Sequence, residues 1–186
     1  MAKKARAVAG RKPDKERIFR EIVAGAIALD LKCGHLKWSV ARLARRSGVS
    51  RPLIYYYFGK SKIRILLEAT KIFGGELAGF TERKTNFWET GRIDLALAES
   101  RKLLQEIPGV AAWYYLQRDG ETEVGESIRK IEADHVKKIQ KYLPEAGEAG
   151  ARAIFALFFG VSFSPIAGPE TPAKAVELVL KGLGKA

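Results

Sequence analysis

Apolar residues recur every three to four positions along most of the chain, and no segment alternates convincingly between apolar and polar residues. This periodicity predicts an all-α protein with about nine helices, because a helix returns to the same face every ~3.6 residues. Residues 81–91 are interpreted as a loop and a helix end. The expected helices cover residues 14–31, 39–47, 50–58, 63–80, 93–107, 110–118, 122–143, 149–163 and 171–181.

Residues 39–62 contain two short predicted helices joined by a tight turn. Ser39 is a good N-cap for the first helix, since its hydroxyl can accept a hydrogen bond from the first turn. Gly48 stands where that helix must end, and glycine permits the sharp turn that follows. Ser50 caps the second helix, and Pro52 falls in its first turn, where a backbone N–H is not needed.

The second of these helices has one apolar face and one basic and aromatic face. Ile54 and Phe58 are four residues apart and point back toward Leu43 and Val49 of the preceding segment. A short helix that is apolar behind and basic and aromatic in front suits the major groove of DNA. The outward residues are Arg51, Leu53, Tyr55 and Tyr56, bracketed by Arg42, Arg45, Arg46, Lys60 and Lys62.

Four short motifs follow one another in this stretch: Leu43-Ala44, Gly48-Val49-Ser50, Ile54-Tyr55 and Tyr57-Phe58, with a lysine a few residues later. Together they resemble the helix-turn-helix signature of the Tet-repressor (TetR) family. The family usually has lysine three residues after the phenylalanine, whereas that position is Ser61 here and the lysine is Lys62. The choice between Lys60 and Lys62 as the phosphate contact therefore stays open.

The resemblance implies a chain of two parts. Residues 13–62 correspond to a TetR-type three-helix DNA-binding domain, with the helix-turn-helix motif at 39–58. Residues 63–186 correspond to a larger helical domain for ligand binding and dimerisation. In the family, a small molecule bound in the larger domain weakens DNA binding, and the last two long helices pack against those of a second subunit.

The net charge of +12 lies entirely in the first third of the chain. Residues 1–62 contain 16 Lys+Arg and 4 Asp+Glu, whereas residues 63–186 contain 17 of each. An excess confined to the helix-turn-helix segment favours contact with a polyanion over a merely solvated surface. Residues 1–12 hold five Lys/Arg and are expected to be a disordered basic arm, which either reaches DNA or attracts it non-specifically.

Each subunit is expected to lay residues 50–57 in a major groove, beginning with Ser50. Arg51 would donate to guanine O6 and N7, while Pro52 and Leu53 would contact thymine methyl groups. The other candidates are assigned to base edges or to the phosphate backbone. These are Tyr55 for either, Tyr56, Tyr57 and Lys62 for the backbone, and Ser39 and Arg42 for a phosphate or an edge base. Packing beside Phe58 is the alternative for Tyr57.

The larger domain supplies aromatic candidates for an apolar or aromatic effector site. Aromatic-lined cavities suit flat or apolar ligands, although aromatic residues at helical spacing also form ordinary core. The candidates are Trp88, Trp113, Tyr114, Phe155 and Phe158.

The predicted helix at 149–163 is apolar on nearly every face, which indicates burial on all sides. A second subunit would supply that burial in a homodimer, and a central place in the protomer's own core is the alternative. A twofold dimer also suits DNA binding, since one short helix covers only a few base pairs. The dimerisation candidates are Phe159, Phe163, Val176, Val179 and Leu180.

No catalytic motif stands out, and neither an enzyme nor a cofactor is expected. The pairs Cys33/His35 and Glu132/His135 are interpreted as ordinary neighbours, with the second pair on the surface, rather than as metal ligands. One cysteine and no secretory signal favour the cytoplasm. The near-apolar run 153–163 is too short for a bilayer, which needs roughly 20 residues, so no membrane partner is expected.

The sequence therefore predicts a homodimeric transcriptional regulator, most simply a repressor released from a palindromic operator by a small effector. One alternative is a DNA-binding protein without an effector, architectural or controlled by a protein partner. Another is an enzyme or carrier with a vestigial helix-turn-helix. Gly74-Gly75, between the two parts, is interpreted either as a flexible point in the relay or as a local break.

Overall fold

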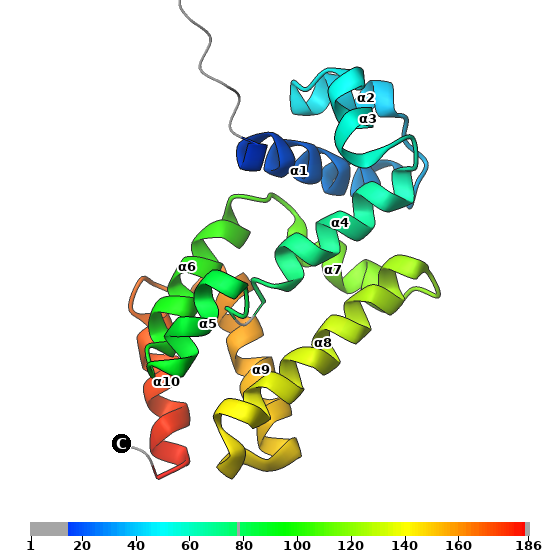
Figure 1. The fold of residues 1–186 in the computed structure, drawn as a ribbon. Helices are drawn as coiled ribbons and strands as arrows, with labels where there is room; N and C mark the ends of the chain where they lie inside the picture. Colours follow the sequence, from blue (N-terminus) through cyan, green and yellow to red (C-terminus); the bar gives the residue numbers. More distant parts are fainter. Residues whose placement is uncertain (1–14, 78, 185–186) are drawn as a thin grey trace, which may run out of the picture.

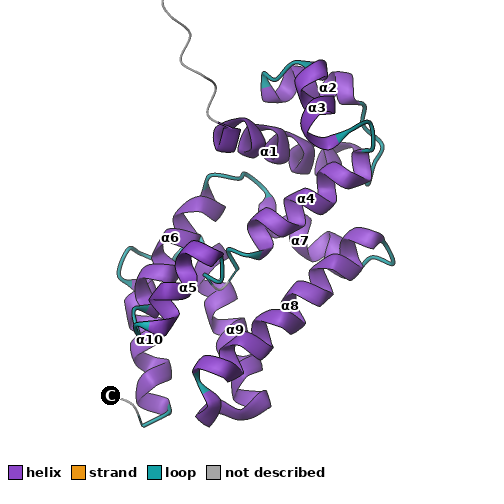
Figure 2. Ribbon diagram, viewed as in Figure 1, coloured by secondary structure: helices purple, strands orange, loops and turns teal. Residues whose placement is uncertain are grey.

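The computed structural model describes residues 15–77 and 79–184, and these form ten α-helices, one 3₁₀ turn and no strand (Figures 1 and 2). The all-α class is confirmed. The extra helix is α5 (Glu82–Glu89), in the segment predicted to be mainly loop. Trp88 and Lys84 form its buried inner face. Because one of these two residues is a lysine, the sequence of this short helix shows no apolar stripe, and the helix was not predicted. The predicted arm at 1–12 lies outside the described residues.

Three helices form the N-terminal part: α1 (Lys15–Cys33), α2 (Val40–Ser47) and α3 (Arg51–Phe58) (Figure 1). As predicted, the Ser39 hydroxyl caps α2 by accepting the Arg42 N–H at 3.3 Å. Gly48 ends α2 in the left-handed conformation, with φ 67°. The fully or nearly buried side chains between these helices include Ile22, Leu43, Val49, Ile54 and Phe58.

Helix α4 (Lys62–Gly74) connects the N-terminal part to the rest of the molecule (Figure 1). It ends at Gly74, and two glycines at and after this end lie close to other helices. A Cβ on Gly74 would stand 2.7 Å from Ile131 Cδ1 of α8, and one on Gly79 would stand 2.7 Å from Ala96 Cβ of α6. Close approach therefore accounts for both glycines, and a flexible relay at Gly74-Gly75 stays a prediction.

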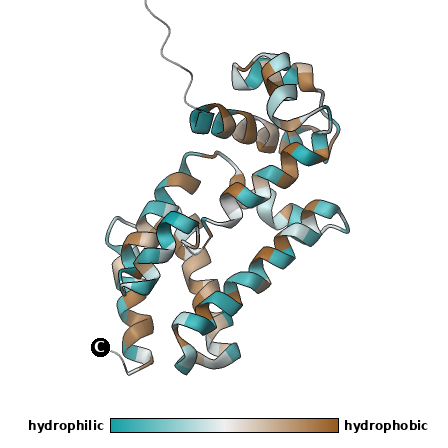
Figure 3. Ribbon diagram, in the orientation of Figure 1, coloured by the Kyte–Doolittle hydropathy of each residue, from teal (hydrophilic) through white to brown (hydrophobic). Residues whose placement is uncertain are grey.

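The larger part contains two antiparallel neighbours, α8 and α9, with α6 and α10 packed beside α9 (Figure 1). Its polar residues cover the outer side of α8, while apolar residues dominate α9 (Figure 3). One apolar core runs without interruption from α1 through α4 to α7 and α9, so it crosses the predicted boundary at residue 62. The bounds are α6 Ile93–Gln105, α7 Val110–Arg118, α8 Glu123–Tyr142, a 3₁₀ turn Pro144–Ala146, α9 Gly147–Phe163 and α10 Thr171–Gly182.

The segment Pro144–Phe163 is long and apolar enough, by length and composition alone, to cross a bilayer. The near-apolar run identified in the sequence, 153–163, is shorter because Arg152 interrupts it. Arg152 pairs with Glu148 on the helix surface. In the fold, α9 packs against α6, α8 and α10. Its buried residues include Ile154 and Phe158, which places α9 among the core helices of the protomer.

Candidate DNA-binding surface

Helix α3 is held rigidly by its inner face and presents its outer face to solvent. Ile54 and Phe58 are completely buried in the core. Arg51 and Pro52 are exposed, and so are Tyr55 and especially Tyr56, whose relative exposure is 80%. Leu53 is half-buried and packs against the core, so it offers less surface to a DNA base than predicted.

Tyr57 has a packing role beside its predicted contact with the DNA backbone. Its half-buried ring meets Phe19 of α1 edge-on at 5.1 Å and Tyr56 at 5.1 Å. The ring therefore fixes α3 against α1. This arrangement agrees with the alternative interpretation of Tyr57 and leaves Tyr56 as the freer of the two side chains.

The polar residues at the starts of α2 and α3 are exposed. Ser39 and Arg42 are exposed at the start of α2, and Arg45 and Arg46 follow them. Ser50 occupies the N-cap position of α3, but its side chain makes no capping hydrogen bond. The exposed Ser50 hydroxyl is consequently available to another acceptor or donor.

Lys62 is engaged inside the protein. Its ammonium donates to the carbonyl oxygens of Leu36 and Trp38, the latter at 3.0 Å, and lies 5.8 Å from the centre of the Trp38 ring. These contacts tie the first turn of α4 to the loop between α1 and α2. Lys60, two residues earlier, is exposed. Of the two lysines left open by the sequence, Lys60 is the one accessible to a phosphate in this structure.

Residues 22–69 match the family model of the bacterial regulatory proteins of the tetR family. This match assigns a TetR-type DNA-binding domain to the chain. The matched residues begin within α1, include the whole helix-turn-helix and end within α4. A domain of this kind supports a DNA-binding regulator. A comparison with curated proteins gave no match.

Solved structures resemble this chain over most of its length. SCO7518, a proposed transcriptional regulator from Streptomyces coelicolor A3(2), has a TM-score of 0.55 and 20% sequence identity, covering 89% of this chain and 97% of its own. A TetR/AcrR-family regulator from Thermobifida fusca YX-ER1 has a TM-score of 0.46 and 21% identity, covering 91% and 97%. The likeness to SCO7518 extends the shared fold beyond the DNA-binding domain.

Asp30 is a buried carboxylate near the end of α1 that organises the loop leading to the helix-turn-helix. It is completely buried. Its Oδ1 accepts the backbone N–H of Leu36 at 2.8 Å and the indole N–H of Trp38 at 2.9 Å. Leu36 has the left-handed φ of 57°, which is costly for a residue with a side chain. Asp30 therefore supports both the strained loop and Trp38, the residue before the Ser39 cap.

The other oxygen of Asp30 reaches the larger domain. Oδ2 accepts the indole N–H of Trp113 at 2.9 Å and the amide N–H of Gln117 at 3.1 Å, both from α7. His35 Nδ1 also lies 3.2 Å from Oδ2. One carboxylate thus joins α1, the loop before α2, and α7.

Sequence reasoning missed Asp30, although a signal was present. The residue lies within the apolar stripe of α1, three positions after the buried Ile27. It is also close to the helix C-terminus, where the helix dipole disfavours a negative charge. An acidic residue in such a position needs buried donors, and those donors come from far along the chain.

The five effector candidates do not gather around one cavity. Trp88, Trp113, Tyr114 and Phe158 are buried core side chains, and only the half-buried Phe155 lines a cavity found in the structure. Tyr114 donates its hydroxyl to Glu132 of α8. Burial and this hydrogen bond raise the pKa of Tyr114 above its usual range, so the hydroxyl stays protonated and keeps donating.

The two histidine pairs are parts of the packing. No group of three potential ligands for a metal ion occurs among residues 15–77 and 79–184. His135 is buried, which corrects the prediction that Glu132/His135 is a surface pair. Its Nε2 donates to the Gly74 carbonyl at 2.6 Å, and burial lowers the pKa of His135 to about 4.

The dimerisation candidates also contribute to the protomer itself. Phe159 and Val176 are buried, while Phe163, Val179 and Leu180 are half-buried against the protomer's own apolar clusters. Aromatic contacts hold Phe159 between Tyr114 and Phe163, at 4.8 and 4.6 Å. Three other apolar side chains of this region are exposed: Leu157 on α9, Leu178 on α10 and Ile166 in the loop between these helices.

Proposed function

We propose that this protein is a homodimeric TetR-family repressor that binds a palindromic operator and is released by a small-molecule effector. The observation that supports DNA reading is the outer face of α3. Arg51, Tyr55 and Tyr56 are exposed there, while Ile54 and Phe58 anchor the helix from behind. A rigid helix with a free arginine at its start has the geometry for base contacts in a major groove.

A second copy of the chain would cover the apolar surface formed by α9, the following loop and α10. Leu157 on α9 and Leu178 on α10 are 40% and 57% exposed, and Ile166 in the loop between them is 93% exposed. Gly160 lets another helix approach α9 closely. Since a single α3 reads only a few base pairs, pairing through this surface would double the contacted sequence.

Effector release requires a route from the larger domain to α3, and α7 supplies one. Tyr114 and Arg118 of α7 bond to Glu132 of α8. From the same helix, Trp113 and Gln117 bond to Asp30. An effector that favours a shifted position of α7 would disturb the support of the loop before α2, and so change the spacing of the two α3 helices.

Selection of bound duplexes from a random pool tests the proposal most directly. The expected result is a palindrome whose half-sites lie one helical turn, or a multiple of it, apart (~10–10.5 bp per turn). An Arg51→Ala, Tyr56→Ala double variant keeps both buried anchors of α3 and serves as the control that should not enrich this sequence. Enrichment of a single half-site would contradict dimeric binding, and no enrichment at all would favour an architectural DNA-binding protein.

A further inference from the structure

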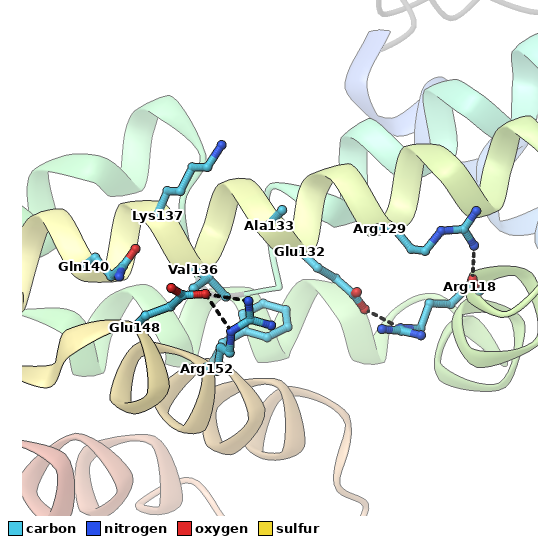
Figure 4. Close-up of a pocket in the computed structure, with 10 residues that line it drawn as sticks. Arg118, Arg129, Glu132, Ala133, Val136, Lys137, Gln140, Glu148 and Arg152 are labelled. Carbon is cyan, nitrogen blue, oxygen red and sulfur yellow. Dashed lines mark hydrogen bonds and ion pairs between the residues drawn. The ribbon is translucent and has the colours of Figure 1, made fainter.

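A cavity of about 600 Å³ opens between the end of α7 and the facing sides of α8 and α9 (Figure 4). Figure 4 shows Arg118 and Arg129 at one end, Glu148 and Arg152 toward the other, and Glu132 between them. Lys137 and Gln140 also line the cavity from α8, and in this view the Lys137 side chain extends upward, away from Glu148 and Arg152. The lining of the cavity thus combines four cations with two carboxylates and an apolar part made by Ala133, Val136 and Phe155.

The charges of this cavity do not cancel. Arg118 pairs with Glu132 at 2.9 Å and with Asp119, which lies outside the lining, at 3.1 Å, and Arg152 pairs with Glu148 at 2.6 Å. Arg129 donates to the backbone carbonyls of Arg118 and Gly120, and neither Arg129 nor Lys137 forms an ion pair with a carboxylate in the described part of the chain. Four cations against two carboxylates leave an excess of two positive charges, although residues 63–186 are neutral as a whole.

The apolar part of the lining consists of side chains that pack against the core. Phe155 is half-buried, with its ring 5.9 Å from His135 and 6.0 Å from Phe159. Val136, one turn after Glu132 on α8, stands beside it. A ligand that places an apolar body on Phe155 and Val136 would bring an attached anionic group within reach of the cations.

We propose that this cavity is the effector site and that the effector is an organic anion with an apolar body. The assignment rests on the proposed function, because it names the ligand class for effector release. It adds an anionic group to the effector predicted from the aromatic residues, which was apolar or aromatic. The site is separate from the proposed dimer surface, since Arg152 and Phe155 lie on a different face of α9 from Leu157 and Gly160.

The cavity wall is bonded directly to the proposed route toward DNA. Glu132 Oε1 accepts from both Arg118 and the Tyr114 hydroxyl. An anion that attracts Arg118 away from Glu132 would leave Tyr114 as the remaining donor to that oxygen. Tyr114 is the neighbour of Trp113, which donates to Asp30. The effector would therefore act at α7 without touching the DNA-binding domain.

Fluorescence titration of the full chain with 8-anilinonaphthalene-1-sulfonate tests the site, since this probe joins an anionic group to an aromatic body. We expect saturable binding of one probe per protomer. In the double variant Lys137→Gln, Arg152→Gln the affinity should fall by about tenfold or more, because two charge-assisted contacts are lost. Lys130→Gln removes an exposed charge of α8 outside the lining and should change the affinity by less than about twofold.

Two further measurements, one with a second probe and one with a third variant, identify what the probe recognises. N-phenyl-1-naphthylamine has the same aromatic body without the sulfonate, so the double variant should bind it as well as the wild type does. Ala133→Trp fills the cavity and should weaken both probes. Equal affinity of the anionic probe for wild type and double variant would overturn the proposal and would point to adsorption on another apolar surface.

The same proteins then separate this proposal from the proposed function. On the selected duplex, saturating anionic probe should weaken DNA binding by the wild type and leave the double variant unchanged. Probe binding at the cavity without any effect on DNA affinity would overturn the effector assignment. Failure of the probe-free protein to select a palindrome would instead contradict the proposed function, and that result is obtained before any probe is added.

Discussion

The helix-turn-helix part and the larger domain differ in where their informative polar side chains lie. In the helix-turn-helix, the core is apolar and the polar and basic residues of α2 and α3 stand outside, where a ligand can meet them. The larger domain also buries some of its polar groups: the ammonium of Lys84 donates to Glu76 and to Ser100, and all three side chains are buried. Exposed groups specify what the protein meets, whereas buried groups specify how its helices fit together.

Asp30 combines both roles and lies where the two parts meet. It belongs to the DNA-binding domain by sequence, yet it is buried and accepts hydrogen bonds from α7 of the larger domain. The contrast therefore holds for side chains away from the junction and breaks down at the junction itself. A regulator that transmits a signal needs such a shared group, because coupling requires an element that both sites influence.

The strongest test of the buried polar groups is Lys84→Met. Leaving Glu76 as an unpaired buried carboxylate should lower the free energy of unfolding by about 3–5 kcal/mol. The double variant Glu76→Leu, Lys84→Met removes the charge as well and should recover most of that loss. Urea unfolding followed by circular dichroism measures both. Equal losses in the single and double variants would show that packing, rather than the ion pair, is responsible.

At the junction, Asp30→Asn should cost about 3 kcal/mol of unfolding free energy, because the new amide N–H₂ faces donors that now lack an acceptor. Trp113→Phe removes one of the two donors from α7, leaving Gln117, and the lost hydrogen bond should cost about 1 kcal/mol. A double-mutant cycle with these two changes should show coupling between them. Purely additive losses would mean that α7 does not depend on the Asp30 carboxylate. Asp94→Asn, at a half-buried acid of α6, is the matched control.

On the exposed side, Arg51→Ala should weaken binding to the selected operator by about 1–3 kcal/mol and relax specificity at one base pair. Its unfolding free energy should stay unchanged, since the side chain is exposed. Binding titrations on operator and random duplexes give the comparison. An equal loss on both duplexes would assign Arg51 to the phosphate backbone instead of a base.

Buried His135 makes the stability of the larger domain depend on pH. Its pKa is about 4 in the folded protein, against 6.5 for the ordinary side chain, so the unfolded chain binds a proton first as the pH falls. The linkage relation then predicts a loss of about 3 kcal/mol of stability between pH 7 and pH 4, and this loss levels off below pH 4. His135→Phe should remove this part of the pH dependence; an unchanged pH profile in urea unfolding would contradict it.

The same contrast explains how far the sequence could be interpreted. The motif residues are neighbours in the chain, and the caps at Ser39 and Gly48 depend on local geometry, so α2, α3 and their outer face could be predicted. Helix α7 was likewise predicted at its observed bounds, 110–118, because Gly109 and Asp119-Gly120 bracket it. Local signals were sufficient wherever the stabilising contacts are local.

Contacts over long sequence distances were beyond that reasoning. Asp30 meets Trp113 and Gln117 at separations of 83 and 87 residues. Aromatic composition indicated burial in the larger domain, but it could not show that only Phe155 of the five effector candidates borders a cavity. The cations of that cavity come from α7, α8 and α9, and each one alone resembles an ordinary solvated residue.

The smallest expected effect distinguishes the two lysines near the end of the motif. Lys60→Ala should reduce the slope of log K against log salt by about 0.9, the value for one lost phosphate contact, and leave stability unchanged. Lys62→Met should leave the slope unchanged and lower the unfolding free energy by about 1 kcal/mol, because Leu36 and Trp38 lose a charged donor. Titrations over several salt concentrations, with urea unfolding of the same samples, measure both quantities. A reduced salt slope for Lys62→Met, with an unchanged slope for Lys60→Ala, would mean that Lys62 leaves the loop when DNA binds. Lys62 would then act both as a support of the loop and as a contact with DNA.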